Sequence, residues 1–323
     1  MPTIARRGPL KRCLTTRRQY TGDLPRRGSL ARGASILALL LCVVCGCRLP
    51  GYEGPMSRSV VTCRELSQRA SAAIDRNDWP TAEQLLVEAT KSCPTDTNAK
   101  RLYAEALWQR GAYIEAAAQI EEAVRRTNDD TLLHVRLAEM RLQMGQLEAA
   151  RREADTAVAL DPRSACAWTM RGRVSRSSGD PRQALADFHR ALSVNAAHTG
   201  ALLELANLYL AMDQPQRALS NVQSALDAYP PGDEPQPCLF LAGMAYTKLA
   251  RYDEAIESLR AATVRDRPTP EILCRLAEAE MLAGRGAAAR QSVEQALALD
   301  PRSPHGRALL ERVAAAEGQA HTR

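Results

Sequence analysis

Small apolar residues recur along most of this chain in a fixed frame. The frame starts anew at Cys63, Thr97, Thr131, Ala165, Thr199, Gln236 and Pro270. Successive starts are 34 residues apart, except across the proline-rich segment 230–235, where the step is 37. The eighth, twentieth and twenty-seventh residues of the frame are alanine or glycine in every copy. Because two helices approach closely only where their contact residues are small, the pattern predicts stacked helix pairs.

Turn-forming residues divide each copy of the frame into two halves. Around positions 14–17 the copies carry residues such as Asn77-Asp78, Gly111, Gly145 and Gly179-Asp180, which end helices and form turns. The predicted domain is therefore all-α and covers residues 63–303. Its seven repeats are 63–96, 97–130, 131–164, 165–198, 199–232, 236–269 and 270–303, followed by a capping helix and tail over 304–323.

Composition supports helices packed through small residues. The hydrophobic share is 45% but the aromatic share only 4%, which is unlike a sheet core rich in Val, Ile and aromatic residues. The net charge of +6 does not belong to the repeats, because residues 1–46 hold nine basic residues and one acidic residue, Asp23. The remainder is nearly neutral. No basic patch for phosphate is indicated, and nucleic acid is not expected as a partner.

Further side chains carry a resemblance to a known family. Trp168 stands at position 4, Tyr209 and Tyr246 at position 11, Phe188 at position 24, and proline at position 32 in four copies. Together with the in-phase small residues, they make residues 63–303 similar to the tetratricopeptide repeat (TPR) family. The resemblance implies a right-handed superhelical solenoid of antiparallel helix pairs. It also implies that the first helix of each pair lines a concave groove for a protein or peptide ligand.

The N-terminal leader, residues 1–46, has the features of an export signal. Residues 34–46 are uncharged and largely apolar and follow Arg26, Arg27 and Arg32; the run is too short to span a bilayer but long enough for a signal peptide. The run ends in Val44-Cys45-Gly46-Cys47, which resembles the lipobox of bacterial lipoproteins. We therefore expect lipidation at Cys47, a tether over 47–62, and a membrane-anchored protein of the bacterial envelope facing the periplasm or exterior. Cleaved secretion, an uncleaved single-span anchor and a cytoplasmic adaptor with a misassigned start remain alternatives.

The family's ligand positions map onto the first helix of each repeat. The candidate peptide groove consists of Arg101, Trp108, Arg136, Arg173, Arg176, Asn207, Phe240, Met244, Lys248 and Arg275. The middle repeats supply Arg136, Arg173 and Arg176, which we expect either to bind an acidic peptide or to pair internally with Glu105 and Glu139. Cys63 and Cys93 occupy positions 1 and 31 of the first repeat. These positions lie at the same end of a helix pair, so a disulfide and two buried thiols both fit.

No catalytic constellation or cofactor site is predicted. The five histidines, residues 134, 189, 198, 305 and 321, occupy unrelated frame positions and no metal-ligand spacing. No phosphate-binding loop or nucleophile motif is present in the sequence. We therefore expect a non-enzymatic scaffold that recruits or assembles envelope or secretion components. The alternative is a docking subunit whose catalytic activity resides in a partner; oligomeric state is not indicated.

Overall fold

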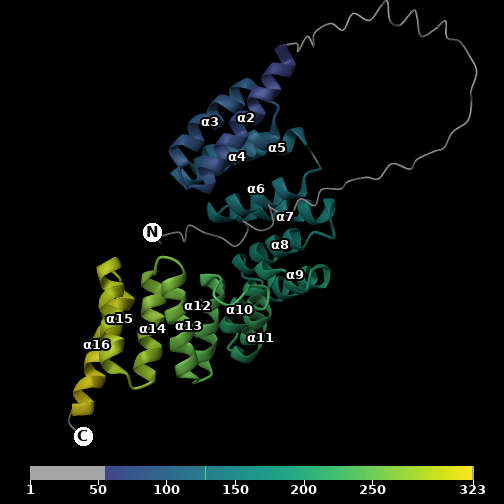
Figure 1. Ribbon diagram of the computed structural model, residues 1–323. Coiled ribbons are helices and arrows are strands. Elements are labelled where there is room, and N and C mark those ends of the chain that lie inside the picture. The colour runs from purple at the N-terminus through teal and green to yellow at the C-terminus, as the bar shows by residue number, and fades with distance from the viewer. Residues whose placement is uncertain (1–54, 128, 322–323) are drawn as a thin grey trace, which may run out of the picture. The chain divides into compact units, whose positions relative to one another are not determined.

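The protein is helical throughout the part that the structure describes. In this computed structural model, residues 55–127 and 129–321 are described, with side chains from Val61 to Ala316. They form fifteen helices and, over the same residues, no strand (Figure 1). The all-α fold predicted from the sequence is confirmed. The leader 1–46 and the predicted lipidation site Cys47 lie outside the described residues.

The helices alternate between a first and a second member of each repeat. The first helices are α2 (Pro55–Asp75), α4 (Thr97–Arg110), α6 (Thr131–Gln143), α8 (Ala165–Ser177), α10 (Thr199–Ala211), α12 (Gln236–Lys248) and α14 (Pro270–Leu282). The second helices are α3 (Trp79–Ser92), α5 (Tyr113–Arg126), α7 (Leu147–Leu160), α9 (Pro181–Val194), α11 (Pro215–Leu226), α13 (Tyr252–Arg265) and α15 (Gly286–Leu299). The chain closes with α16 (Pro304–His321). Every second helix thus begins at position 17 of the frame.

The turn between paired helices has the same backbone conformation in all seven repeats. Position 15 has a positive φ in each: Gly111, Gly145, Gly179 and Gly284 supply it as glycine, and Asn77, Asp213 and Ala250 supply it with a side chain. At this left-handed residue the chain reverses, and the next N–H returns to a carbonyl of the first helix, as Ala112 N does to Leu107 O at 2.9 Å. Ala250 is strained there, because its Cβ is disfavoured at φ 58°.

The small residues of the frame form the helix contacts, as predicted. The alanines at positions 20 and 27 are at most 1% exposed in every repeat. Position 8 is glycine in two repeats because a bulky residue lies against it. A Cβ added at Gly172 would meet the Phe188 ring at 2.5 Å. One at Gly243 would collide with Leu259.

The described residues divide into two compact units, with the boundary after Leu133. In the N-terminal unit, α2 packs against α3 and α4, and α4 packs against α5. In the C-terminal unit, which starts at His134, neighbouring helices pack in sequence from α7 onward, and α16 covers α14 and α15. Each unit is therefore built from contacts between neighbours in the chain, as expected for helical repeats.

The beginning of the first repeat differs from the prediction. Residues 47–62 were expected to be a tether and Cys63 the start of the first helix, whereas α2 already begins at Pro55. Proline is favoured in the first turn of a helix, and no further proline or glycine follows before Asp75. None of the helices in the described residues is both long and apolar enough to cross a membrane.

Candidate partner-binding face

The first helices of the C-terminal unit form a continuous row. Helix α10 packs against both α8 and α12, and α12 packs against α14 (Figure 1). Residues at positions 2, 5, 6, 9, 12 and 13 lie on one side of each helix, because residues three or four apart in the sequence are about one turn apart. We call this surface the first-helix face. In the C-terminal unit it consists of Arg136, Arg173, Arg176, Asn207, Phe240, Met244, Lys248 and Arg275 together with the side chains that bond to them.

The three middle arginines are paired within the chain. Arg136 and Arg173 both donate to Glu139, the latter at 3.1 Å. Arg173 Nε also lies 3.2 Å from Glu204 Oε1. Arg176 Nη2 is 3.1 Å from Glu204 Oε2. The result is a ladder of alternating charge, Arg136–Glu139–Arg173–Glu204–Arg176, which runs across α6, α8 and α10.

This ladder is largely shielded from solvent. Glu139 is 2% exposed and Glu204 8% exposed. Such buried carboxylates need cationic partners, because an uncompensated buried charge costs several kcal/mol. Of the two alternatives that the sequence left open for these arginines, the geometry favours internal pairing over a free basic stripe.

The remaining candidate cations of the C-terminal unit also have carboxylate partners. Lys248 Nζ lies 2.6 Å from Asp213 Oδ1, and Arg275 Nη1 lies 2.9 Å from Glu278 Oε2. Glu278 is contacted in addition by His305 Nε2 at 3.5 Å. Positive charge on this face is thus balanced residue by residue.

Between the charged ends of the face lie an amide and two apolar side chains. Asn207 on α10 and Phe240 and Met244 on α12 are all partly exposed. Met244 packs on the largest apolar cluster, and Phe240 packs against Leu239 and Ile272. An asparagine amide offers two donors and an acceptor, and Phe and Met offer apolar contact area. This combination suits a peptide backbone with apolar side chains.

The two candidate residues of the N-terminal unit are placed differently. Arg101 donates to Asn98 Oδ1 at 3.0 Å. The ring of Trp108 lies tilted against that of Tyr113, with centroids 4.6 Å apart. Both residues are on α4, as expected; Arg101 contacts a residue of the same helix, and Trp108 contacts the first residue of α5.

Sequence reasoning missed Glu204, the second carboxylate of the ladder. It named Glu105 and Glu139 as possible internal partners; Glu139 is one of them, and Glu105 accepts from Gln109 Nε2 at 3.4 Å. The available signal was repeat spacing: Arg173 follows Glu139 by 34 residues, and Glu204 follows Arg173 by 31. Opposite charges one repeat apart on first helices are neighbours in a helical repeat.

The two cysteines of the first repeat lie together. Cys63, 1% exposed, and the partly buried Cys93 belong to one apolar cluster with Leu66, Ala89 and Ala99. Neither is disulfide-bonded in the structure. Cys63 Sγ donates to Asp96 Oδ2 at 3.3 Å. Burial, and then Asp96 and Cys93, raise the pKa of the Cys63 thiol to about 12. The expected proximity is present, and the disulfide itself stays a prediction.

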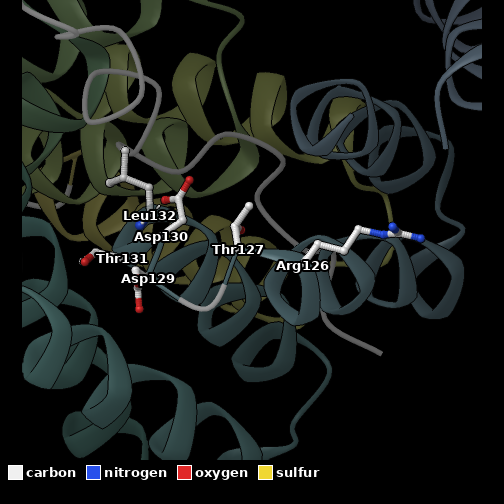
Figure 2. Close-up of a pocket in the computed structure, with 6 residues that line it drawn as sticks. All are labelled: Arg126, Thr127, Asp129, Asp130, Thr131 and Leu132. Atoms are coloured by element: carbon white, nitrogen blue, oxygen red, sulfur yellow. Dashed lines mark hydrogen bonds between the residues drawn. The ribbon is translucent and has the colours of Figure 1, made fainter. Parts of the chain in front are cut away.

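A surface depression of about 640 Å³ follows α5 in the N-terminal unit. It is lined by one stretch of chain that includes Arg126, Asp129 and Asp130 (Figure 2). The Asp130 carboxylate already accepts from Leu132 N at 3.0 Å, and the Arg126 side chain extends away from both aspartates. The depression is therefore the surface of a single local turn of the chain. No group of three metal-ligating side chains occurs among the described residues.

The architecture defines a class of protein: helix pairs repeated at a constant interval, packed through small residues and closed by a terminal helix. Models of the tetratricopeptide repeat match residues 67–131, 175–237 and 240–304, which together are more than half of the chain. The chain belongs to the tetratricopeptide repeat family, as its sequence pattern indicated. Repeats of this family are interaction scaffolds that bind proteins or peptides.

Solved structures share the fold at low identity. A tetratricopeptide repeat protein from Parabacteroides merdae is 16% identical with a TM-score of 0.57, covering 78% of this chain and 99% of that one. PilW, a type IV pilus biogenesis factor, is 19% identical with a TM-score of 0.57, covering 66% and 98%. Yeast Tom70 is 15% identical with a TM-score of 0.59, covering 84% and 57%. No curated protein matches the chain.

Proposed function

We propose that this protein is a non-enzymatic scaffold, lipid-anchored in the bacterial envelope through Cys47, which holds a component of envelope or secretion machinery on its first-helix face. The observation that carries the binding part is the composition of that face. Asn207, Phe240 and Met244 are partly exposed on adjoining first helices, whereas the surrounding cations are paired with carboxylates. The favoured ligand is a segment with apolar side chains.

The paired arginines have a second consequence for the ligand. The charges of Arg136, Arg173 and Arg176 are already neutralised by Glu139 and Glu204, so an acidic peptide would compete with these carboxylates for the arginines. The exchange leaves a buried carboxylate with fewer partners, which is unfavourable. An acidic tail is therefore a weaker candidate ligand than an apolar one, and the ladder acts as a support for the face.

The envelope part of the proposal rests on the leader. The short apolar run behind arginines and the cysteine that ends it are typical of a lipoprotein signal. The fold likeness to PilW is compatible with a role in assembling envelope structures. Replacing Cys47 with Ala is expected to abolish labelling of the protein by a fatty-acid probe and to release it from the membrane fraction. Continued labelling would contradict lipidation at this residue.

Partner binding is tested with matched surface substitutions. Full-length protein is captured from detergent-solubilised envelopes of its own cells, and the co-purifying proteins are quantified. Met244→Glu introduces a charge into the apolar part of the face, and Asn207→Ala removes the amide. Both variants are expected to lose the same specific proteins about tenfold or more. Val264→Glu, at a site on α13 that is 86% exposed, is the control and is expected to retain them.

The experiment separates binding from folding, because circular dichroism and the thermal midpoint are measured for all three variants. Equal recovery of every co-purifying protein by folded Met244→Glu and Asn207→Ala variants would refute the assignment of the first-helix face.

A further inference from the structure

The thiols of Cys63 and Cys93 occupy a structural junction in the N-terminal unit. Cys63 lies on α2, and Cys93 directly follows the last residue of α3 and caps that helix; its N–H still bonds to Ala89 O at 2.9 Å. Asp96, in the turn that follows, begins α4 by accepting from Asn98 N at 2.8 Å and Ala99 N at 3.1 Å. A bond between the two sulfurs would therefore connect α2 to the turn between α3 and α4.

The folded structure protects Cys63 from oxidation. Its side chain is enclosed by Leu66, Ala89 and Ala99, and its proton is held toward Asp96. The thiolate is the form that attacks a disulfide. The raised pKa of Cys63 keeps the thiolate fraction small at neutral pH. Cys93 is more exposed than Cys63, so an oxidant reaches it first.

We propose that Cys63 and Cys93 form a disulfide that connects α2 to the α3–α4 turn, and that this bond forms readily only while the first helix pair is open. The oxidant belongs to the class of small or protein disulfides. In the first step the Cys93 thiolate attacks one sulfur of the oxidant, and the other sulfur leaves as a thiolate. In the second step the Cys63 thiolate attacks the Cys93 sulfur, and the second oxidant thiolate leaves.

The thiol–disulfide exchange is balanced in atoms and electrons. Two cysteine protons and two electrons are transferred, and the oxidant disulfide ends as two thiols. Asp96 keeps its two backbone donors throughout, so loss of the Cys63 donor does not uncap α4.

The position of the bond has a physical rationale. Helix α2 is the first described helix, and it packs against α3 and α4. The end of a repeat array has fewer neighbours and opens more easily than its interior. A cross-link that closes the loop from residue 63 to residue 93 restricts the opened state and stabilises this end.

The test uses full-length protein and differential alkylation read by mass spectrometry. After reduction, unfolding and refolding with oxidised glutathione, a Cys63–Cys93 peptide pair is expected, together with a rise in the midpoint of the first thermal transition of about 3–10 °C over the reduced protein. Cys93→Ser and Cys63→Ala are expected to show no such rise. Cys274→Ser removes another buried thiol and serves as the matched control, so the rise is retained.

The timing is tested by oxidising the protein after it has folded. Folded, reduced protein is expected to form the bond at least about tenfold more slowly than protein in mild denaturant, with a mixed disulfide accumulating on Cys93. Equal rates in both states would overturn the requirement for an open helix pair. Free thiols at both residues after refolding with the oxidant, or equal midpoints for oxidised and reduced protein, would overturn the disulfide.

Discussion

In two repeats, glycine at position 8 makes room for a large residue at position 24. Gly172 faces the ring of Phe188, and Gly243 faces Leu259. Elsewhere position 8 is alanine, as at Ala206 opposite Val222. At Gly172 and Gly243 the large partner leaves no space for a Cβ, so the two residues of each of these pairs must be changed together.

Replacing Gly172 with Ala tests this complementarity. Alanine raises helix propensity by about 1 kcal/mol over glycine, but overpacking a core costs about 1–3 kcal/mol. The two Phe188 ring atoms that would lie 2.5 and 2.7 Å from the added Cβ belong to a rigid side chain that cannot bend away. We therefore expect a net loss of stability, measured by urea unfolding, and partial recovery in Gly172→Ala/Phe188→Leu. A stabilised single variant would contradict the packing argument.

Replacing Ala250 with Gly is expected to increase stability, in contrast to the loss expected for Gly172→Ala. This residue has φ 58° at the position where four other repeats have glycine. A left-handed alanine costs about 1–2 kcal/mol relative to an unstrained backbone, and glycine loses part of that gain by freeing the unfolded chain. Ala250→Gly is expected to raise the free energy of unfolding by about 0.5–1 kcal/mol. Ala315→Gly, at an exposed site in the interior of α16, is the control and should lower it.

At the scale of the element, helix α10 starts at a cap that is sensitive to pH. His198 Nδ1 accepts from Ala201 N at 3.1 Å, which requires that nitrogen to be unprotonated. Burial lowers the pKa of His198 below its ordinary value of 6.5. The unfolded chain therefore takes up a proton more readily than the folded one. The stability from this cap is complete above pH 6.5 and decreases as pH falls from there toward the lower folded pKa.

Replacing His198 with Asn tests whether the histidine cap causes this pH dependence of stability. His198→Asn keeps a side-chain acceptor at the cap but does not titrate. Unfolding in urea at pH 7.5 and pH 5 is expected to show a larger loss at pH 5 for the wild type than for this variant. The same pH dependence in both proteins would assign it to other groups.

The ladder across α6, α8 and α10 is also an element-scale feature. Glu139→Gln removes a carboxylate that is 2% exposed and leaves Arg136 and Arg173 without it. Loss of one partner from such a buried network is expected to cost about 3 kcal/mol. Glu254→Gln, which breaks the exposed pair with Arg251, is the control and should change the urea midpoint little. Equal effects would show that the ladder contributes no more than a surface pair.

Small residues and turns made the helix pairs predictable, whereas side-chain pairing was not. Alanine or glycine at three positions in phase leaves few packings open, and each first helix from Thr97 onward begins at the first residue of its frame. The ladder depends on rotamers and on neighbours from different repeats. Glu204 therefore became visible as a partner only when α8 and α10 were placed side by side. The early start of α2 was missed because no small-residue pattern marks residues 55–62.

At the scale of the whole molecule, the proposed anchor and the proposed binding face lie in different parts of the chain. The predicted anchor is at Cys47, outside the described residues. The binding face belongs to the C-terminal unit, and the proposed disulfide belongs to the N-terminal unit. Each can be removed independently, by Cys47→Ala, Met244→Glu or Cys93→Ser, with distinct expected losses: membrane association, partner recovery and the oxidised thermal shift.

Site-specific photo-cross-linking in the cell tests the central claim most directly, because it records contacts at one residue in the native envelope. A benzophenone amino acid replaces Met244 on the first-helix face in one strain and Val264 on α13 in another. Irradiation is expected to give a discrete adduct with one protein at Met244, absent without light and lost in the Asn207→Ala background, and none at Val264. The same adducts at both residues, or none at Met244, would contradict a scaffold that holds its partner on this face.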